Sequence, residues 1–98
     1  TLERIVELCC SAPAKLTGFD GRKGEISVGA DADLVILDMD HEETLHAEHS
    51  HYMCGWMPSE DFETRGRPRM TILRGRVIME DGNVTAEQGS GQLLRPQR

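Results

Sequence analysis

Four histidines and a cysteine between residues 41 and 54 are the side chains of this sequence best suited to bind a metal. They are His41, His46, His49, His51 and Cys54. Imidazole and thiolate groups are the usual ligands of Zn²⁺ in proteins. His49 and His51 form an HxH pair, which His41 or His46 and Cys54 would have to complete. This spacing matches no standard structural zinc pattern, so we predict a solvated surface loop and no metal bound by this chain.

Asp31 and Asp33 are the second candidate, because two nearby carboxylates are the groups that general acid–base catalysis uses. They stand on either side of Ala32, shortly after Gly29 and directly before an apolar run. Aspartates in such a place commonly form turns and cap the connection to a strand. We therefore predict a structural role for both carboxylates.

Two further groups of residues have the composition of anion-binding sites. One is the Gly89-Ser90-Gly91 triplet, and the other is a set of five arginines: Arg65, Arg67, Arg69, Arg74 and Arg76. A lone GxG without a helix after it is weak evidence for phosphate binding, so we predict a flexible tail there. For the arginines we predict a solvated face or interface ion pairs.

The elements that must position these side chains begin with helices. Apolar residues at helical spacing predict a helix over roughly residues 2–10, and they are Leu2, Ile5, Val6 and Cys9. Ser11 is the expected N-cap of a second short helix, with Pro13 in its first turn and Gly18 as its stop. Cys9 and Cys10 are expected to fill a helix face.

Strand patterns follow from Gly21 onward. Alternation at Ile26 and Val28 predicts a half-buried strand over about 24–28, and an uninterrupted apolar run predicts a strand buried on both faces over about 33–38. Residues 39–67 are expected to be irregular. A hairpin is predicted over 70–79 around Arg74-Gly75, and a turn at Asp81-Gly82 leads into a short final strand. These patterns predict about five strands.

Composition limits the class of protein. The 98 residues carry a net charge of −6, with 10 glycines and three cysteines. The acidic balance argues against nucleic acid or an anionic membrane surface as a partner. No apolar run approaches the roughly 20 residues that span a bilayer. An odd number of cysteines is a poor disulfide framework, so we predict a reduced, cytoplasmic setting.

Several motifs together resemble the C-terminal end of the amidohydrolase superfamily. The run KGEISVGADADLVILD at residues 23–38 resembles its "KGxIxxGxDADLVxxD" segment, and residues 11–18 resemble "SxPAKxxG". The hairpin TILRGRVI at 71–78, the Glu80-Asp81-Gly82 turn and the GSGQLLR tail at 89–95 are similar to hydantoinases and dihydropyrimidinases. Allantoinases and dihydroorotases share the DADLV segment and the hairpin, so these branches stay open.

The resemblance implies a mainly β fold with N-terminal helices. In the family this is the C-terminal part of a composite β-sandwich domain that accompanies a metal-dependent (β/α)8 barrel. Residues 1–19 would be the last helices that close the barrel. Residues 20–85 would be the β-rich segment, and residues 86–98 the C-terminal tail. Leu93 and Leu94 would dock on other protein surface.

The resemblance also implies a function for the longer protein. That protein would hydrolyse the ring amide of a small cyclic substrate with two divalent metal ions, usually zinc, bridged by a carboxylated lysine. Neither Lys15 nor Lys23 matches that lysine, so we expect no catalytic residue, cofactor or metal ligand in this chain. Expected partners are the rest of the same protein and further copies of it, as a homotetramer. A non-enzymatic dihydropyrimidinase-like scaffold protein is the alternative of another class.

Overall fold

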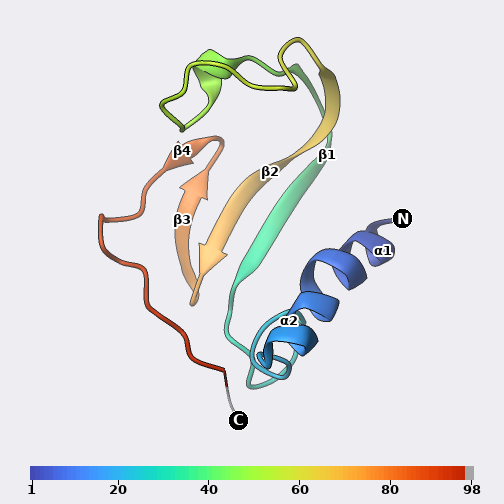
Figure 1. The fold of residues 1–98 in the computed structure, drawn as a ribbon, viewed down its shortest axis with the longest axis vertical. Helices are drawn as coiled ribbons and strands as arrows, with labels where there is room; N and C mark the ends of the chain where they lie inside the picture. Colours follow the sequence, from blue (N-terminus) through green and yellow to red (C-terminus); the bar gives the residue numbers. More distant parts are fainter. Residues whose placement is uncertain (97–98) are drawn as a thin grey trace.

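A helical segment stands beside a four-stranded sheet in the computed structural model of the chain, which describes residues 1–96 (Figure 1). The helical segment comprises α1 (Leu2–Val6), a π-helical turn (Glu7–Ser11) and α2 (Ala12–Thr17). The sheet comprises β1 (Leu34–Thr44), β2 (Glu63–Leu73), β3 (Arg76–Glu80) and β4 (Asn83–Val84). A short 3₁₀ helix (Ala47–His49) lies in the loop between β1 and β2.

The three helical pieces form one continuous helix, which differs from the two helices predicted. Thr1 caps its start, since the Thr1 hydroxyl accepts a hydrogen bond from the Arg4 backbone N–H at 3.3 Å. Ser11 has helical dihedral angles and makes no capping hydrogen bond, so its prediction as an N-cap is wrong. The Ser11 hydroxyl instead donates to the Gly24 carbonyl at 3.0 Å.

No helix in the described part of the chain has the length and apolar character needed to cross a bilayer.

The helix ends at Gly18, as predicted. Gly18 has a left-handed φ of 75°, and the next N–H, that of Phe19, bonds back to the Ala14 carbonyl at 2.8 Å. This is the arrangement that satisfies the last carbonyls of a helix and favours glycine. It turns the chain back beneath the helix, where Gly24 approaches Ala14 and Cys10.

The strand predicted over residues 24–28 does not form. The segment consists of bends and a turn, with Ile26 90% exposed and Val28 fully exposed. Alternating apolar residues need a neighbouring strand and a covering layer to become a sheet. Neither is present beside this segment in the described residues.

The sheet is an antiparallel meander in the order β1-β2-β3-β4. The predicted hairpin is confirmed, with Leu73 paired to Arg76 across the Arg74-Gly75 turn. The Asp81-Gly82 turn and the short strand after it are also confirmed. The sheet therefore has four strands, and the fifth expected strand is the missing segment 24–28.

The prediction of an irregular stretch over residues 39–67 is wrong at both ends. β1 continues to Thr44, which pairs with Glu63 at the start of β2. The register shifts between Asp38 and Glu42, where the Asp38 carboxylate accepts the N–H groups of Asp40 and His41 at 3.1 and 3.2 Å. Only residues 45–62 form a true loop, at the far end of the β1–β2 ribbon (Figure 1).

Residues 1–96 form no hydrophobic core of their own. Ala14 is the single buried apolar residue among those described, and no helix packs against a strand there. The chain exposes 8079 Å², whereas a compact protein of this mass exposes about 5600 Å². Its radius of gyration is 15.4 Å, against about 12.6 Å for a compact domain of this length.

The central strand segment illustrates this lack of cover. Val35 is 56% exposed, and Ile36 and Leu37 are exposed to a similar extent. The prediction that residues 34–37 are buried on both faces therefore does not hold in this chain. Cys9 and Cys10 are exposed as well, so they do not fill a buried helix face here.

Gly24→Ala tests the close approach beneath the helix in the protein that carries this chain. A Cβ at Gly24 would lie 2.6 Å from both the Ala14 Cβ and the Cys10 carbonyl oxygen, at a φ of +85°. The matched control Gly21→Ala has a φ of +76° and nothing within 4 Å. Both variants carry the left-handed penalty of about 1–2 kcal/mol, and Gly24→Ala adds an overpacking cost of about 1–3 kcal/mol. Equal losses in urea unfolding would contradict the close approach.

Candidate functional site

The most highly connected polar cluster lies where the loop after the helix meets the tip of the β2–β3 hairpin. We call Arg22, Lys23, Asp31, Asp33 and Arg74 the polar junction. Lys23 is central to it, because its ammonium contacts the Asp31 carboxylate at 2.7 Å and also pairs with the Asp33 carboxylate. The Arg22 guanidinium adds a 3.1 Å contact to Asp31. All four of these side chains are partly shielded from solvent.

Asp33 joins two segments that are far apart in the sequence. Its Oδ2 faces Lys23, and its Oδ1 accepts a hydrogen bond from the Arg74 backbone N–H at 2.8 Å. Beside it, the Gly75 N–H donates to the Ala32 carbonyl at 2.9 Å. These bonds hold the hairpin turn against the loop that follows the helix. The junction is therefore the place where the helical part and the sheet are tied together.

The charges of the junction stabilise one another. Burial opposes ionisation of Asp33, but the bonds from Lys23 and from the Arg74 N–H outweigh it and lower the pKa of Asp33 below 3.8. The hydrogen bond from Lys23, opposed by partial burial and aided by Arg22, lowers the pKa of Asp31. Burial of Lys23 is likewise outweighed by its two carboxylate partners, so the pKa of Lys23 is raised above 10.5. All three groups therefore stay charged over a wide range of pH.

This arrangement supports the structural interpretation of Asp31 and Asp33. A general base needs a free carboxylate with a pKa near the working pH, whereas both carboxylates here are ion-paired and have lowered pKa values. Lys23 is equally committed to its two partners. Lys15 lies in α2 and lines the same open pocket as Lys23, beside Asp20 and Glu25.

The histidines predicted from the sequence to be the best metal ligands are not brought together as a set. His49 lies 3.6 Å from Glu48, while the His51 ring pairs with the Gly82 carbonyl at 3.1 Å. His41 lies on β1 beside Glu43 at 3.7 Å, and Cys54 donates to the Trp56 carbonyl. These residues have separate partners and do not fit the two-metal centre that the resemblance implies.

One of the candidate histidines, His46, is brought close to two carboxylates. The His46 Nδ1 lies 3.2 Å from Glu60 Oε1 and 3.6 Å from Asp61 Oδ1. Glu60 also accepts the Ala47 N–H at 2.8 Å, and that bond, followed by the one from His46, lowers the pKa of Glu60. The approach of His46 to Glu60 and Asp61 was not predicted from the sequence. The two acidic residues follow His46 by 14 and 15 positions, a separation that matches no motif.

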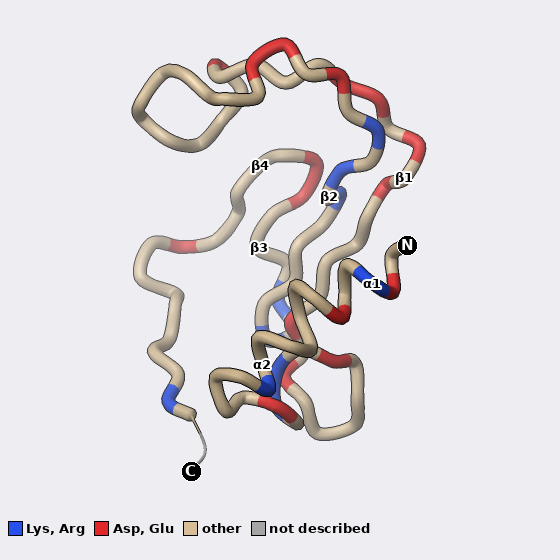
Figure 2. Tube along the Cα trace, turned by 45° about the vertical axis from the view of Figure 1, so that its right-hand side comes forward, with Lys and Arg blue, Asp and Glu red and all other residues tan. Residues whose placement is uncertain are grey.

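The arginine cluster makes ion pairs within the chain. Arg65 contacts Asp40 at 2.8 Å, and both Arg67 and Arg69 reach Asp81, at 3.4 and 4.0 Å. Figure 2 shows basic positions of β2 beside acidic positions of β1 in the upper part of the ribbon. Three of the five arginines are thus paired with carboxylates among the described residues.

The tail is held at one point. The Arg74 guanidinium donates to the Ser90 carbonyl at 2.8 Å, so the GSG triplet rests against the hairpin turn. Ser90 is therefore anchored where a flexible tail was predicted. The last two residues of the predicted tail, 97 and 98, lie outside the described residues.

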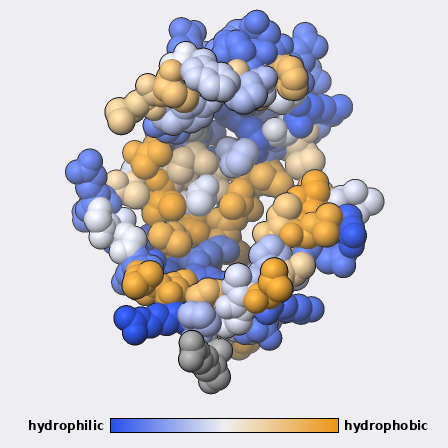
Figure 3. Space-filling view, viewed as in Figure 1, coloured by the Kyte–Doolittle hydropathy of each residue, from blue (hydrophilic) through white to orange (hydrophobic). Residues whose placement is uncertain are grey.

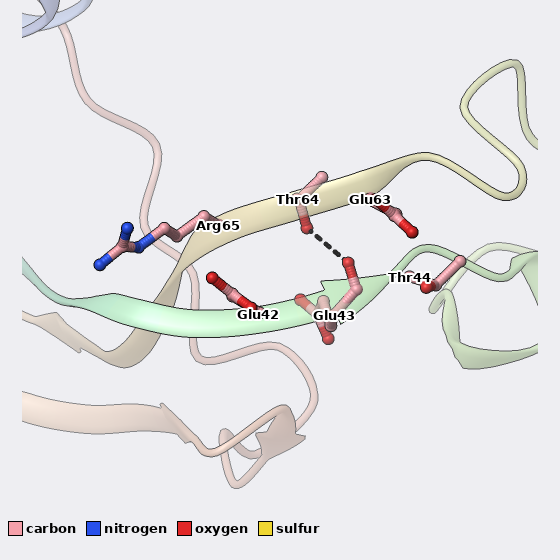
Figure 4. Close-up of a pocket in the computed structure, with 6 residues that line it drawn as sticks. All are labelled: Glu42, Glu43, Thr44, Glu63, Thr64 and Arg65. Carbon is pink, nitrogen blue, oxygen red and sulfur yellow. Dashed lines mark hydrogen bonds between the residues drawn. The ribbon is translucent and has the colours of Figure 1, made fainter.

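An acidic groove follows the end of the β1–β2 ribbon. It is lined by Glu42, Glu43, Thr44, Glu63, Thr64 and Arg65 (Figure 4). The Thr64 hydroxyl donates to the Glu43 carbonyl at 3.2 Å across the two strands. The groove is open and strongly polar, and nothing in its geometry indicates a bound molecule.

Many large apolar side chains are exposed to solvent. Side chains on the helix and on β1 are exposed together, including Leu2, Ile5, Val6, Leu8, Val35, Ile36, Leu37 and Met39. Figure 3 shows apolar side chains gathered across the middle of one face, over the sheet and beside the helix. Exposed apolar side chains gathered on one face are a common feature of surfaces that contact other protein.

Comparison with known proteins identifies the class to which this fold and surface belong. The model of the amidohydrolase family matches residues 1–79, so the chain belongs to the amidohydrolase family. Members of this family are generally metal-dependent. Within it, the chain is hydantoinase-like in both sequence and structure.

Three matches define that likeness. An L-hydantoinase of Paenarthrobacter aurescens is 42% identical over 94 residues, which is 96% of this chain and 20% of the relative. The solved L-hydantoinase (dihydropyrimidinase) from Arthrobacter aurescens superposes with a TM-score of 0.91 over 94% of this chain and 20% of its own. A dihydropyrimidinase from Brevibacillus agri superposes with a TM-score of 0.94 at 27% identity, over 98% of this chain and 21% of its own. The chain thus spans about a fifth of the length of the relatives it matches.

Asp33→Asn tests the polar junction. The variant keeps the shape of the side chain but removes the charge that Lys23 contacts. Loss of a charge-assisted bond predicts a decrease of about 1.5–3 kcal/mol in the free energy of unfolding. Asp20→Asn is the control, because Asp20 is in the same loop and makes no ion pair among residues 1–96. A similar loss in both variants, measured by urea unfolding, would refute the junction.

The pH dependence of that difference is also predicted. Asp33 has a lowered pKa, so its contribution is complete above 3.8 and is lost as the pH falls through the lower folded value. Lys23 has a raised pKa, so its contribution is complete below 10.5 and is lost as the pH rises through the higher folded value. The difference between wild type and Asp33→Asn should be constant from about pH 5 to 9 and shrink in stronger acid.

Proposed function

We propose that this chain is the C-terminal accessory part of a metal-dependent cyclic amide hydrolase of the hydantoinase or dihydropyrimidinase type. The observation that carries the proposal is the surface of the chain, which exposes 8079 Å², while Ala14 is the one buried apolar side chain of residues 1–96. A chain that cannot form a core by itself needs further protein to cover it. The relatives it matches are about five times longer, and they bear the names of hydantoinases.

The proposed division of the longer protein is the one that the resemblance to the family implies. Residues 1–19 close a (β/α)8 barrel, residues 20–85 form one part of a composite β-sandwich, and residues 86–98 form the tail. The remaining strands of the sandwich come from elsewhere in the protein. The exposed alternation of Ile26 and Val28 supports this division, because these side chains need a partner strand and a covering layer.

Chemistry is assigned to the part of the protein outside this chain. Two divalent metal ions, of which zinc is the first choice, would there activate a water molecule for attack on the ring amide carbonyl. Within the described residues, Asp31, Asp33 and Lys23 are paired with one another and His49 and His51 have separate partners. This chain therefore contributes stability and position and no catalytic group. The longer protein is a cytoplasmic homotetramer in this proposal.

Activity of the protein that carries this chain tests the proposal. The purified, zinc-loaded protein should open the rings of hydantoin and dihydrouracil, which a loss of ultraviolet absorbance and product analysis both record. Ring opening of allantoin or dihydroorotate alone would move the protein to the allantoinase or dihydroorotase branch. A folded oligomer that binds no metal and opens none of these rings would instead be a non-enzymatic scaffold.

Val35→Asp tests whether the exposed strand is covered in that longer protein. If Val35 lies beneath another layer, an unpaired charge enters an apolar environment, and we expect a loss of about 3 kcal/mol or more in stability. Val35→Thr is the control, because it keeps the branched shape that suits a strand and adds no charge. Thermal unfolding compares the three proteins. Equal melting temperatures for wild type and Val35→Asp would show that Val35 stays exposed, as it is in this chain.

A further inference from the structure

We propose that His46, Glu60 and Asp61 form a binding site for a zinc-type divalent ion. One ligand atom from each side chain lies within 4.8 Å of the other two. The His46 Nδ1 is the shared point, at 3.2 Å from Glu60 Oε1 and 3.6 Å from Asp61 Oδ1. An ion placed among these three atoms would need only small side-chain movements to reach bonding distances of about 2.0–2.2 Å.

The backbone fixes the two halves of this site. His46 follows β1 after Leu45, and Glu60 and Asp61 precede Phe62 and β2, so the site closes the loop between the strands. The Asp61 N–H donates to the Leu45 carbonyl at 2.9 Å, and the Leu45 N–H donates to the Phe62 carbonyl at 2.9 Å. These two bonds extend the pairing of the strands up to the site. The positions of the ligands are therefore set by the sheet.

Glu60 is also oriented for this role. Its Oε2 accepts the Ala47 N–H at 2.8 Å, which leaves Oε1 turned toward His46. Bonds of this kind, from a neighbouring group to the second oxygen of a metal-binding carboxylate, raise metal affinity by holding the ligand in place. The ring of His49 stands edge-on to that of His46, with 5.8 Å between the ring centres. A second imidazole is thus next to the site.

The donor atoms indicate which ion fits. One imidazole nitrogen and two carboxylate oxygens suit Zn²⁺, which accepts mixed nitrogen and oxygen ligands. Ca²⁺ and Mg²⁺ prefer oxygen ligands throughout, so a histidine disfavours them. All three side chains are at least partly exposed, which leaves room for water or His49 to complete the coordination. This inference revises the expectation from the sequence that the chain binds no metal.

Zinc titration of the full-length protein tests the proposal. The protein is first loaded with its own metal and freed of excess by gel filtration, and ZnCl₂ alone is then added in a calorimeter. We expect one further equivalent per chain to bind saturably. His46→Ala should abolish this equivalent, and Glu60→Gln should weaken it by at least about tenfold.

A matched control separates the site from general binding by surface histidines. His41→Ala removes another histidine that stands near a carboxylate, Glu43 at 3.7 Å, but lies outside the proposed site. It should leave the further equivalent unchanged. Circular dichroism checks that each variant is folded. If His46→Ala unfolds the protein, Asp61→Asn serves as the test variant. Asp61 is 80% exposed, so the Asp61→Asn protein should fold normally but bind zinc more weakly.

Three results would overturn the proposal. They are the absence of a further equivalent in the wild-type protein, its full retention in the folded His46→Ala or Asp61→Asn variant, and an equal loss in His41→Ala. The measured quantity is zinc bound per chain. Ring-opening activity is not used, so the outcome is independent of the proposed function.

Discussion

The arrangement of this chain depends on the Asp33 carboxylate, which bonds to Lys23 with one oxygen and to the Arg74 N–H with the other. No helix comes into close backbone contact with a strand in residues 1–96, so close packing of these elements does not hold the helical part to the sheet. The polar junction does so instead. Such a connection fixes the relative orientation of the two parts but adds little to the total stability, since a few hydrogen bonds each contribute about 1–3 kcal/mol.

This balance explains why the turns of the chain are well defined although its apolar side chains are not packed into a core. Local hydrogen bonding determines each turn, from the Gly18 helix end to the Asp81-Gly82 turn. The apolar side chains of the helix and of β1 nevertheless remain exposed. In a self-contained domain the order is reversed, because burial of apolar surface supplies most of the stability and the polar contacts refine it. The proposal that further protein completes this chain rests on that difference.

The structural role of the polar junction also accounts for residues that could otherwise act in catalysis. Carboxylates and a lysine that read as catalytic candidates are used to hold the hairpin tip against the loop, and their lowered or raised pKa values follow from that pairing. Perturbed pKa values accompany structural ion-pair networks as well as active sites. The histidine that gains carboxylate neighbours, His46, lies at the opposite end of the β1–β2 ribbon from the hairpin turn, where the loop closes.

The sequence by itself determined those features that short-range chemistry controls. Gly18 ends the helix, and Arg74-Gly75 and Asp81-Gly82 form turns, because only a few residues tolerate these backbone conformations. The motifs of residues 23–38 and 71–78 likewise sufficed for the family. Tertiary structure decided the rest. Residues 39–44 extend β1 despite their polar composition because β2 lies beside them, whereas 24–28 stay irregular without a neighbour. The meeting of His46 with Glu60 and Asp61 arises only from strand pairing, which no local pattern encodes.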